Sequence, residues 1–283
     1  MNANSLPLTP AFNQWLADAS ARLSNVLVPS ANLDAEIILA HAIAKDRTYL
    51  HAHPEQIIDA VQIKKANEML EQRLNRVPIA YIIGDKEFYG RQFITTPSVL
   101  IPRPESETII DLLKEILLPI TYYLPPTKLI DIGTGSGNLG ITAKLEFPNL
   151  DVTLTDVSGD ALKIAAKNSI ELSVDVKILQ SDLLENYSEQ VDIIIANLPY
   201  VDKVWERSTE TNYEPDLALF ANNHGLSLIE RLIAQSEKTL VPGGYIILES
   251  DPIQHKTLID FANKKGLSLI KQQDYIFVLR SQC

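Results

Sequence analysis

Four consecutive residues, Asn197, Leu198, Pro199 and Tyr200, carry the groups best suited to chemistry in this sequence. An amide side chain, a backbone carbonyl ahead of a proline and an aromatic ring can together hold a flat nitrogen group by hydrogen bonding and stacking. A side-chain amide and an adenine amine both fit this description, and in both the nitrogen lone pair is delocalised. The tetrad alone does not decide between them.

A glycine-rich segment, DIGTGSGNLG at residues 131–140, follows an apolar strand-like run and opens a helical pattern. In that context glycine lets the backbone approach a bound ligand closely. Gly135, Gly137 and Gly140 also satisfy G-x-G-x-x-G, so a nicotinamide or flavin dinucleotide is a competing ligand. The segment predicts a nucleotide-like cofactor without selecting one.

Two acidic residues end the next two strands of the pattern. Asp156 closes DVTLTD, where a carboxylate can accept both hydrogen bonds from a ribose diol, although a helix cap is the alternative because Ser158 follows. Asp182 closes ILQSD, where the next loop would meet an adenine, and an N-cap is again the alternative. Leu183 could pack on that base.

The elements that position these residues alternate strand and helix from residue 128 onward. Short, almost wholly apolar runs such as KLIDIG, VDIIIAN and GGYIILES alternate with helical segments, which predicts a doubly wound α/β fold with a mostly parallel sheet covered on both faces. Such sheets bind ligands at the carboxyl ends of their strands, where the glycine-rich segment and the tetrad both lie. A dehydrogenase would need a proton donor or acceptor there, and the tetrad offers poor candidates.

The first 78 residues have helical periodicity instead. Thr9-Pro10 is a helix-start signal, and LDAEIILAHAIAK and PEQIIDAVQIKKANEMLEQRLN continue the pattern, so we predict a small helical bundle. His41, His51 and His53 have no acidic or cysteine partners at ligand spacing, and we expect no metal site.

Residues 79–102 differ from both halves of the chain. Apolar and aromatic side chains cluster around two glycine positions, as in short strands joined by turns, which predicts a β-hairpin linking two domains. The segment IPRPESETIIDLLKEIL then opens a helix, which we expect to begin the second domain.

Composition narrows the class of protein. The chain of 283 residues is 46% hydrophobic and 22% charged, as expected for a globular protein with a substantial core. Its net charge of −11 opposes binding to a nucleic-acid backbone. The single cysteine, Cys283, excludes an internal disulfide, and no leader or long apolar run is evident, so we expect a cytoplasmic protein.

The combination of loop, ribose acid and tetrad resembles the class I S-adenosylmethionine-dependent methyltransferases, with a Rossmann-like domain at residues 103–283. The resemblance implies S-adenosyl-L-methionine as cofactor and S-adenosyl-L-homocysteine as product, with Asp156 on the ribose. It assigns cofactor contacts to the following residues: Asp131, Gly133, Thr134, Gly135, Ser136, Gly137, Asp156, Asp182, Leu183 and Asn197.

Three further segments resemble the PrmC/HemK family, glutamine methyltransferases that act on peptide chain release factors. These segments are PIAYIIGDKEFYG, LIPRPESE and YEPDLALFANNHGLSLIERLI, and the likeness covers nearly the whole chain. Leu198 replaces the first proline of the family's usual tetrad, and LESDP replaces a segment in which glutamate is usually followed by glycine. A backbone carbonyl survives the change at Leu198, so its acceptor role is retained.

The resemblance implies that the glutamine of a Gly-Gly-Gln loop is methylated on its side-chain amide nitrogen. Asn197 and the carbonyl of Leu198 would accept the two amide hydrogens, Pro199 would stiffen the turn, and Tyr200 would pack on the amide. Arg103 and Glu105 would line the substrate cleft. Residues 1–78 would dock the release factor, the alternative being a bundle that only stabilises the hairpin.

Two rival functions stay open at this point. An adenine N6-methyltransferase acting on RNA or DNA could stack a flipped base on Tyr200, although about 100 residues precede the cofactor domain here and the chain is acidic. A degenerate fold used as a binding scaffold is the other rival, and the complete loop with Asp156 and Asn197 argues against it. We expect a monomer without direct nucleic-acid binding or membrane association.

Overall fold

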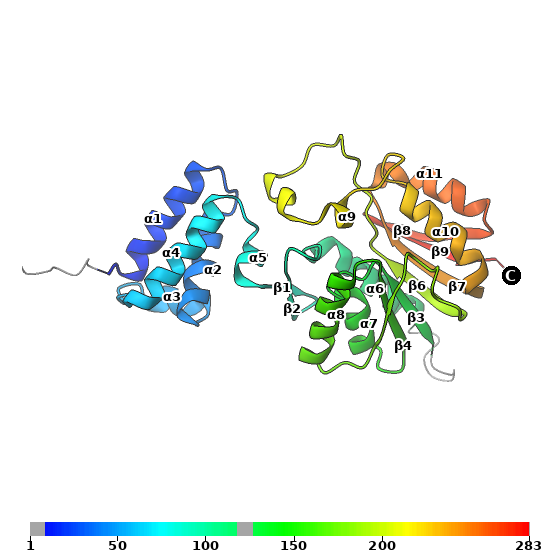
Figure 1. Ribbon diagram of the computed structural model, residues 1–283, viewed down its shortest axis with the longest axis horizontal. Coiled ribbons are helices and arrows are strands. Elements are labelled where there is room, and N and C mark those ends of the chain that lie inside the picture. Colours follow the sequence, from blue (N-terminus) through cyan, green and yellow to red (C-terminus); the bar gives the residue numbers. More distant parts are fainter. Residues whose placement is uncertain (1–8, 118–126, 283) are drawn as a thin grey trace, which may run out of the picture. The chain divides into compact units, whose positions relative to one another are not determined.

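The computed structural model describes residues 9–117 and 127–282, so Cys283 lies outside the described residues. The chain divides into two compact units: Met1–Gly84 with Ser208–Tyr213, and Asp85–Arg207 with Glu214–Cys283 (Figure 1). No helix in the described ranges is long and apolar enough to cross a bilayer. Within the same ranges, no group of three or more His, Cys, Asp or Glu side chains is placed to hold a metal ion.

The first unit is built of helices, as the periodicity predicted. They are α1 (Phe12–Asn25), α2 (Ala31–Ile43), α3 (Arg47–Ala52), α4 (Ala60–Leu74) and α5 (Ile79–Ile83). The apolar face of α1 buries Phe12, Trp15, Ala19 and Leu23 in a core shared with α2 and α4. Asp59 caps α4, because its carboxylate accepts the backbone N–H groups of the first turn.

The hairpin is shorter than the sequence suggested. Residues 79–83, which we expected to be a strand, form α5 between Pro78 and Gly84, whose left-handed φ of 89° ends the helix. The hairpin itself consists of β1 (Asp85–Phe88) and β2 (Arg91–Ile94), which pair antiparallel. The aromatic and β-branched residues of this segment favour a strand. Pro78 at its start and Gly84 at its end favour a helical turn instead.

A segment from the second half of the sequence belongs to the first unit. Residues 208–213 contain the 3₁₀ helix η2 (Thr209–Tyr213), and Glu210 accepts hydrogen bonds from Arg73 at 3.0 Å and from Arg76 at 2.8 Å. Arg73 is buried and also donates to Asp34 at 2.7 Å. Burial alone would raise the pKa of Glu210, but hydrogen bonds from Arg76, Ser208 and Arg73 outweigh it and lower the pKa to about 2.

Replacing Glu210 by glutamine is expected to destabilise the first unit by roughly 3 kcal/mol at pH 7, because the pKa falls from 4.5 to about 2 on folding. This stabilisation is complete above pH 4.5 and is lost as the pH falls from 4.5 towards 2. Urea unfolding monitored through Trp15, in a Trp205→Phe background, measures the difference across that range. Glu206→Gln, on an exposed part of the same loop, is the control. Equal loss of stability at pH 7 and pH 2 would contradict the prediction.

The second unit contains one seven-stranded sheet of order β5-β4-β3-β6-β7-β9-β8. The strands are β3 (Lys128–Ile132), β4 (Asp151–Asp156), β5 (Lys177–Gln180), β6 (Val191–Ala196), β7 (Leu240–Glu249), β8 (Leu267–Gln273) and β9 (Ile276–Ser281). Pairs from β5 to β7 are parallel, while β9 runs antiparallel to both β7 and β8. The mostly parallel α/β fold is thus confirmed, and β8 is a strand that the sequence pattern did not indicate.

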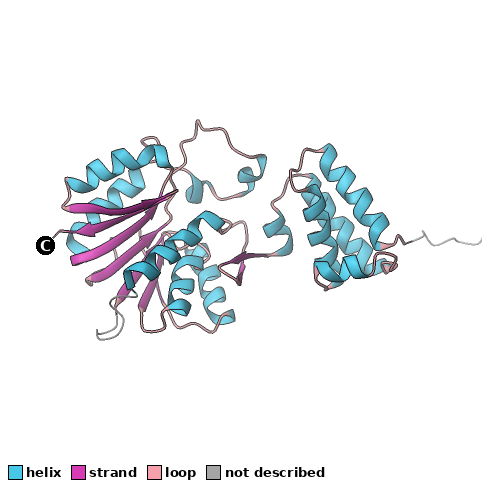
Figure 2. Cartoon of the chain, turned by 180° about the vertical axis from the view of Figure 1, so that it is seen from behind, coloured by secondary structure: helices cyan, strands magenta, loops and turns pink. Residues whose placement is uncertain are grey.

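Helices cover both faces of this sheet (Figure 2). One face packs on α6 (Glu107–Leu117), α7 (Asn138–Glu146) and α8 (Gly159–Glu171), and the other on α10 (Ser227–Thr239) and α11 (Pro252–Asn263). The side chains of β6 alternate between the two cores, with Ile193 and Ile195 on one face and Ile194 on the other. Two short helices, η1 (Pro104–Ser106) and α9 (Asp216–Leu219), lie in the connections.

Strand β3 pairs with β4 on one side and with β6 on the other, so the strand order of the sheet reverses at β3. Adjacent parallel strands whose connections lead in opposite directions leave a crevice at their carboxyl ends. The glycine-rich segment follows β3 and the tetrad follows β6. The topology therefore brings the two sequence motifs to the same edge of the sheet.

Candidate functional site

The glycine-rich segment forms a tight loop between β3 and α7. Gly133, Gly135 and Gly137 have φ values of 69°, 56° and 83°, in the left-handed region that favours glycine. A Cβ on Gly133 would lie 2.8 Å from the Leu198 side chain, so this position also needs glycine for space. The loop thus presents backbone to the crevice, as a close-fitting ligand requires.

Asp131 holds this loop by hydrogen bonds from the protein interior. Its carboxylate is fully buried and accepts hydrogen bonds from the Thr134 hydroxyl at 2.6 Å and from the Gly140 N–H at 2.9 Å. Burial outweighs both hydrogen bonds and raises its pKa to about 6. Asp131 does not line the crevice, so direct contact with a cofactor stays a prediction while its hold on the loop is evident.

Asp156 ends β4 beside the loop. One carboxylate oxygen accepts the N–H of Gly135 at 3.0 Å and the other accepts the N–H of Ser158 at 2.8 Å. Ser158, not Asp156, caps α8, since its hydroxyl accepts the N–H of Ala161. Each oxygen of Asp156 keeps a second lone pair for a hydroxyl donor, and burial raises the pKa of this carboxyl. This geometry supports the diol role more than the cap role.

Asp182 and Leu183 follow β5 at the same edge. Arg231 on α10 donates to Asp182 at 2.9 Å, a contact that the sequence did not reveal. Leu183 adopts a φ of 52°, which is unusual for a leucine and found mostly where surrounding structure enforces it. All three residues line the crevice.

Asn197 lies at the end of β6, with its side chain tied to η1. Its Nδ2 donates to the Ser106 hydroxyl at 2.9 Å, which leaves Oδ1 as the atom available to a further donor. Leu198 is buried, and its side chain packs in the core between β6 and the glycine loop. Pro199 lines the crevice with both of them.

Tyr200, the last residue of the tetrad, is not among the residues that line the crevice. Its hydroxyl donates to Glu249 at 3.2 Å, and burial together with the nearby charge of Glu249 raises the pKa of this hydroxyl. The Tyr200 carbonyl accepts a hydrogen bond from Gln254 at 2.8 Å, and a Cβ on Gly225 would clash with it. Contact between Tyr200 and a substrate therefore stays a prediction, whereas its role in holding the tetrad is observed.

Arg103 and Glu105, the two residues expected in the substrate cleft, differ in position. Arg103 lines the crevice and pairs with Glu214, whose buried carboxylate also accepts the N–H of Ile101 at 3.1 Å. Glu105 is exposed on η1 and does not line the crevice. Glu214 belongs to YEPDLAL, so the resemblance of that segment was a signal for it.

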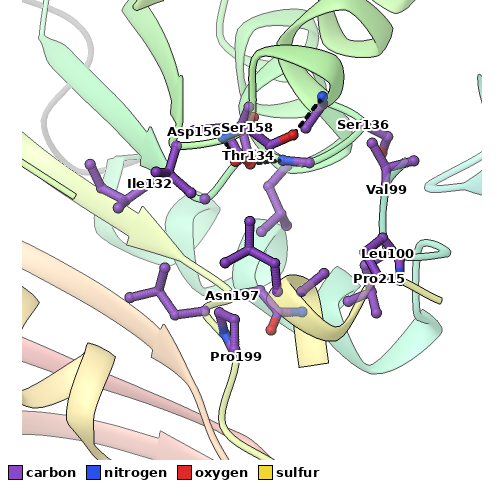
Figure 3. A pocket seen from close by; sticks show the side chains of 18 of the residues that line it. Val99, Leu100, Ile132, Thr134, Ser136, Asp156, Ser158, Asn197, Pro199 and Pro215 are labelled. Atoms are coloured by element: carbon purple, nitrogen blue, oxygen red, sulfur yellow. Dashed lines mark hydrogen bonds between the residues drawn. The ribbon is translucent and has the colours of Figure 1, made fainter. Parts of the chain in front are cut away.

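These parts enclose one cavity of about 290 Å³ in the second unit (Figure 3). It is lined by eleven of the residues singled out in the sequence: Arg103, Gly133, Thr134, Gly135, Ser136, Asp156, Asp182, Leu183, Asn197, Leu198 and Pro199. Asp131, Gly137, Tyr200 and Glu105 are outside the lining. The sequence analysis assigned no site role to the walls formed by residues 98–102, 215, 217 and 218, although most of them lie in segments that resemble the family.

The family models match both halves of the chain. Residues 14–84 match the PrmC N-terminal domain, and residues 105–212 match the methyltransferase small domain. A release factor glutamine methyltransferase of Koribacter versatilis is 36% identical over 266 residues, covering 90% of this chain and 92% of that protein. A bifunctional methyltransferase of Rickettsia bellii is 35% identical over 268 residues, covering 84% of this chain and 48% of that protein.

A solved structure supports the fold independently. The 16S rRNA N2 G1207 methyltransferase of T. thermophilus, in complex with AdoMet and guanosine, superposes with a TM-score of 0.53 at 19% identity. The match covers 70% of this chain and 50% of that one. At this identity the likeness establishes a shared methyltransferase architecture.

Proposed function

Because this chain belongs to the family of release factor glutamine methyltransferases, we propose that it methylates the side-chain amide nitrogen of the glutamine in a release factor's Gly-Gly-Gln loop. The chain is an S-adenosylmethionine-dependent methyltransferase. The residues of the crevice fit this cofactor: the glycine backbone leaves room beside Leu198, and Asp156 offers two acceptors for the ribose hydroxyls.

The cofactor, when bound, supplies an electrophilic methyl group on a sulfonium. A glutamine nitrogen is a weak nucleophile, so this chain's residues contribute mainly by positioning. Asn197 Oδ1 and the Leu198 carbonyl accept the two amide hydrogens and hold the nitrogen facing the cofactor. In this transfer the carbon–nitrogen bond would form as the methyl–sulfur bond of the cofactor breaks, its electron pair would stay on the sulfur of S-adenosyl-L-homocysteine, and one of the two amide hydrogens would leave to solvent as a proton. The observation that carries this proposal is Asn197 in the same cavity as the glycine loop and Asp156.

We place the substrate-docking role in the helical first unit and the reaction in the cytoplasm. The match of residues 14–84 to the PrmC N-terminal domain supports the first of these. The chain is proposed to act as a monomer and without direct binding to nucleic acid, in keeping with its charge of −11.

The deciding experiment incubates the protein with cofactor carrying a tritiated methyl group and, in separate reactions, a release factor, ribosomal RNA or DNA. Label confined to one factor peptide that contains Gly-Gly-Gln is the expected result. A release factor with Gln→Ala in that loop is the matched control and should take up no label. Labelling of adenine in RNA or DNA, with the release factor unlabelled, would overturn the proposal in favour of adenine methylation.

Leu198→Pro is expected to keep kcat within a few-fold of wild type, because only the backbone carbonyl is needed. The smaller side chain should cost roughly 1–2 kcal/mol of stability, since Leu198 is buried against the glycine loop. Initial rates together with thermal unfolding separate the two effects. Leu198→Ala, which keeps the carbonyl but leaves a larger cavity, is the control. An inactive but folded Leu198→Pro protein would contradict the prediction.

A further inference from the structure

A buried hydrogen-bonded chain leads from the sheet to the Asn197 amide. Glu249 ends β7 and is 1% exposed, and Ser106 in η1 is also 1% exposed. The Ser106 hydroxyl donates to Glu249 Oε2 at 2.6 Å and accepts from Asn197 Nδ2 at 2.9 Å. The three residues come from segments far apart in the sequence, so their alignment is a product of the fold.

The direction of these hydrogen bonds follows from the groups themselves. An ionised carboxylate can only accept, so the single hydroxyl proton of Ser106 must point to Glu249. The Ser106 oxygen then offers only lone pairs to Asn197, which must turn its NH₂ group towards it. As a result, the amide oxygen of Asn197 is the atom left for a ligand.

We infer that Glu249 and Ser106 are positioning residues, which orient the Asn197 amide so that its oxygen accepts a hydrogen from the substrate amide. The inference rests on the proposed function, because an N–H donor on the substrate is what makes this orientation necessary. With the amide reversed, two NH₂ groups would face each other and no hydrogen bond would form between them. Correct orientation is thus a condition for placing the nitrogen.

Glu249 does not serve as a proton acceptor for the substrate in this arrangement. Ser106 and Asn197 line the cavity, whereas Glu249 lies behind them and outside the lining. Its other oxygen accepts the Tyr200 hydroxyl at 3.2 Å, so the same carboxylate also holds the last residue of the tetrad. Glu249 therefore acts on the substrate only through other residues.

Protonation of Glu249 would reverse the direction of the hydrogen bonds from Asn197 through Ser106 to Glu249. A carboxyl proton donated to the Ser106 oxygen would turn the serine hydroxyl towards Asn197, whose amide would then present its oxygen to Ser106 and its NH₂ to the substrate. The charges of Arg103 and Glu105 act on this carboxyl and Tyr200 donates to it, while Asp251 and Tyr275 act on the Tyr200 hydroxyl. Burial dominates and raises the pKa of Glu249 to about 7. Methyl transfer should therefore increase as the pH rises through about 7.

Kinetics of three variants with a release factor test the inference. Ser106→Ala should lower kcat about 10- to 100-fold with cofactor affinity within two-fold of wild type, while Ser106→Thr, which keeps the hydroxyl, should restore most activity. Glu249→Gln should lose the rise in rate near pH 7. Ser250→Ala, a neighbouring buried serine hydroxyl outside the cavity, is the control and should match wild type. Wild-type activity in Ser106→Ala, or an unchanged pH profile in Glu249→Gln, would overturn the inference.

A second readout is independent of the substrate. In ¹⁵N NMR spectra of the full chain, the side-chain NH₂ signal of Asn197, identified by its loss in Asn197→Ala, should shift with an apparent pKa near that of Glu249. The shift should vanish in Glu249→Gln. A wild-type protein that leaves release factors unmethylated but shows this titration would refute the proposed function and support the orienting chain. Absence of the titration in wild type would refute the orienting role of Glu249 and Ser106, whatever the substrate is.

Discussion

Replacement of Asn197 by alanine is expected to lower kcat for methyl transfer at least about 100-fold while affinity for S-adenosylmethionine changes less than about three-fold. The side chain is proposed to hold the substrate amide, and loss of such positioning costs on the order of 10²-fold or more. The glycine loop and Asp156, which are expected to provide most of the cofactor contacts, do not depend on the Asn197 amide for any observed hydrogen bond. Single-turnover rates and calorimetric titration with the cofactor measure the two quantities separately.

Two further variants sharpen this test. Asn197→Asp keeps an acceptor oxygen but removes the NH₂ donor to Ser106, so its rate should fall between those of wild type and alanine. Asn186→Ala removes an asparagine that donates to the Gln180 carbonyl outside the cavity, and it should behave as wild type. Full turnover of a release factor by the Asn197→Ala variant would contradict the positioning mechanism.

The positions of the residues proposed to bind the cofactor were largely predictable from the sequence, because their signals are local. Glycines with a left-handed φ, an apolar strand before them and a helix after them can be read within ten residues, and Asp156 follows one strand later. The rule that parallel strands bind ligands at their carboxyl ends then placed the tetrad beside the loop. The structure has eight of the ten residues predicted to contact the cofactor in the lining of one cavity.

The supporting contacts were not predictable, because they join residues far apart in the sequence. Ser106 and Glu249 are separated by 143 positions, and Arg73 and Glu210 by 137. No local sequence pattern indicates such a pairing. In the sequence alone, each of these residues is an ordinary polar side chain. Tyr200 illustrates the same limit: no local pattern indicates that its hydroxyl binds Glu249, while its contact with a substrate stays a prediction.

The tetrad also depends on segments that carry no chemistry themselves. Gly225 has a φ of 83°, and its missing side chain leaves room for the Tyr200 carbonyl, which Gln254 then binds. The segment around Gly225 resembled the family in sequence, and this packing is a physical reason for the glycine there. These contacts hold the loop that carries Leu198, which lacks the fixed φ of proline.

Replacement of Asp156 by alanine is the second change with a large expected effect, and it should act mainly on cofactor binding. Loss of two charge-assisted hydrogen bonds to the ribose hydroxyls costs roughly 3 kcal/mol, which corresponds to a Kd for S-adenosylmethionine about 100-fold higher. At saturating cofactor, kcat should recover to within about ten-fold of wild type. Asp151→Ala, at the opposite end of the same strand and paired with Lys177 at 2.7 Å, is the matched control.

A cofactor analogue distinguishes ribose binding from a general loosening of the loop, since Asp156 also accepts the N–H groups of Gly135 and Ser158. S-adenosylhomocysteine lacking the ribose 2′-hydroxyl should bind wild type more weakly than the intact molecule, whereas Asp156→Ala should bind the two equally. A loosened loop would weaken both ligands without removing the difference between them. Persistence of the wild-type preference in the variant would therefore place the ribose contact on another residue.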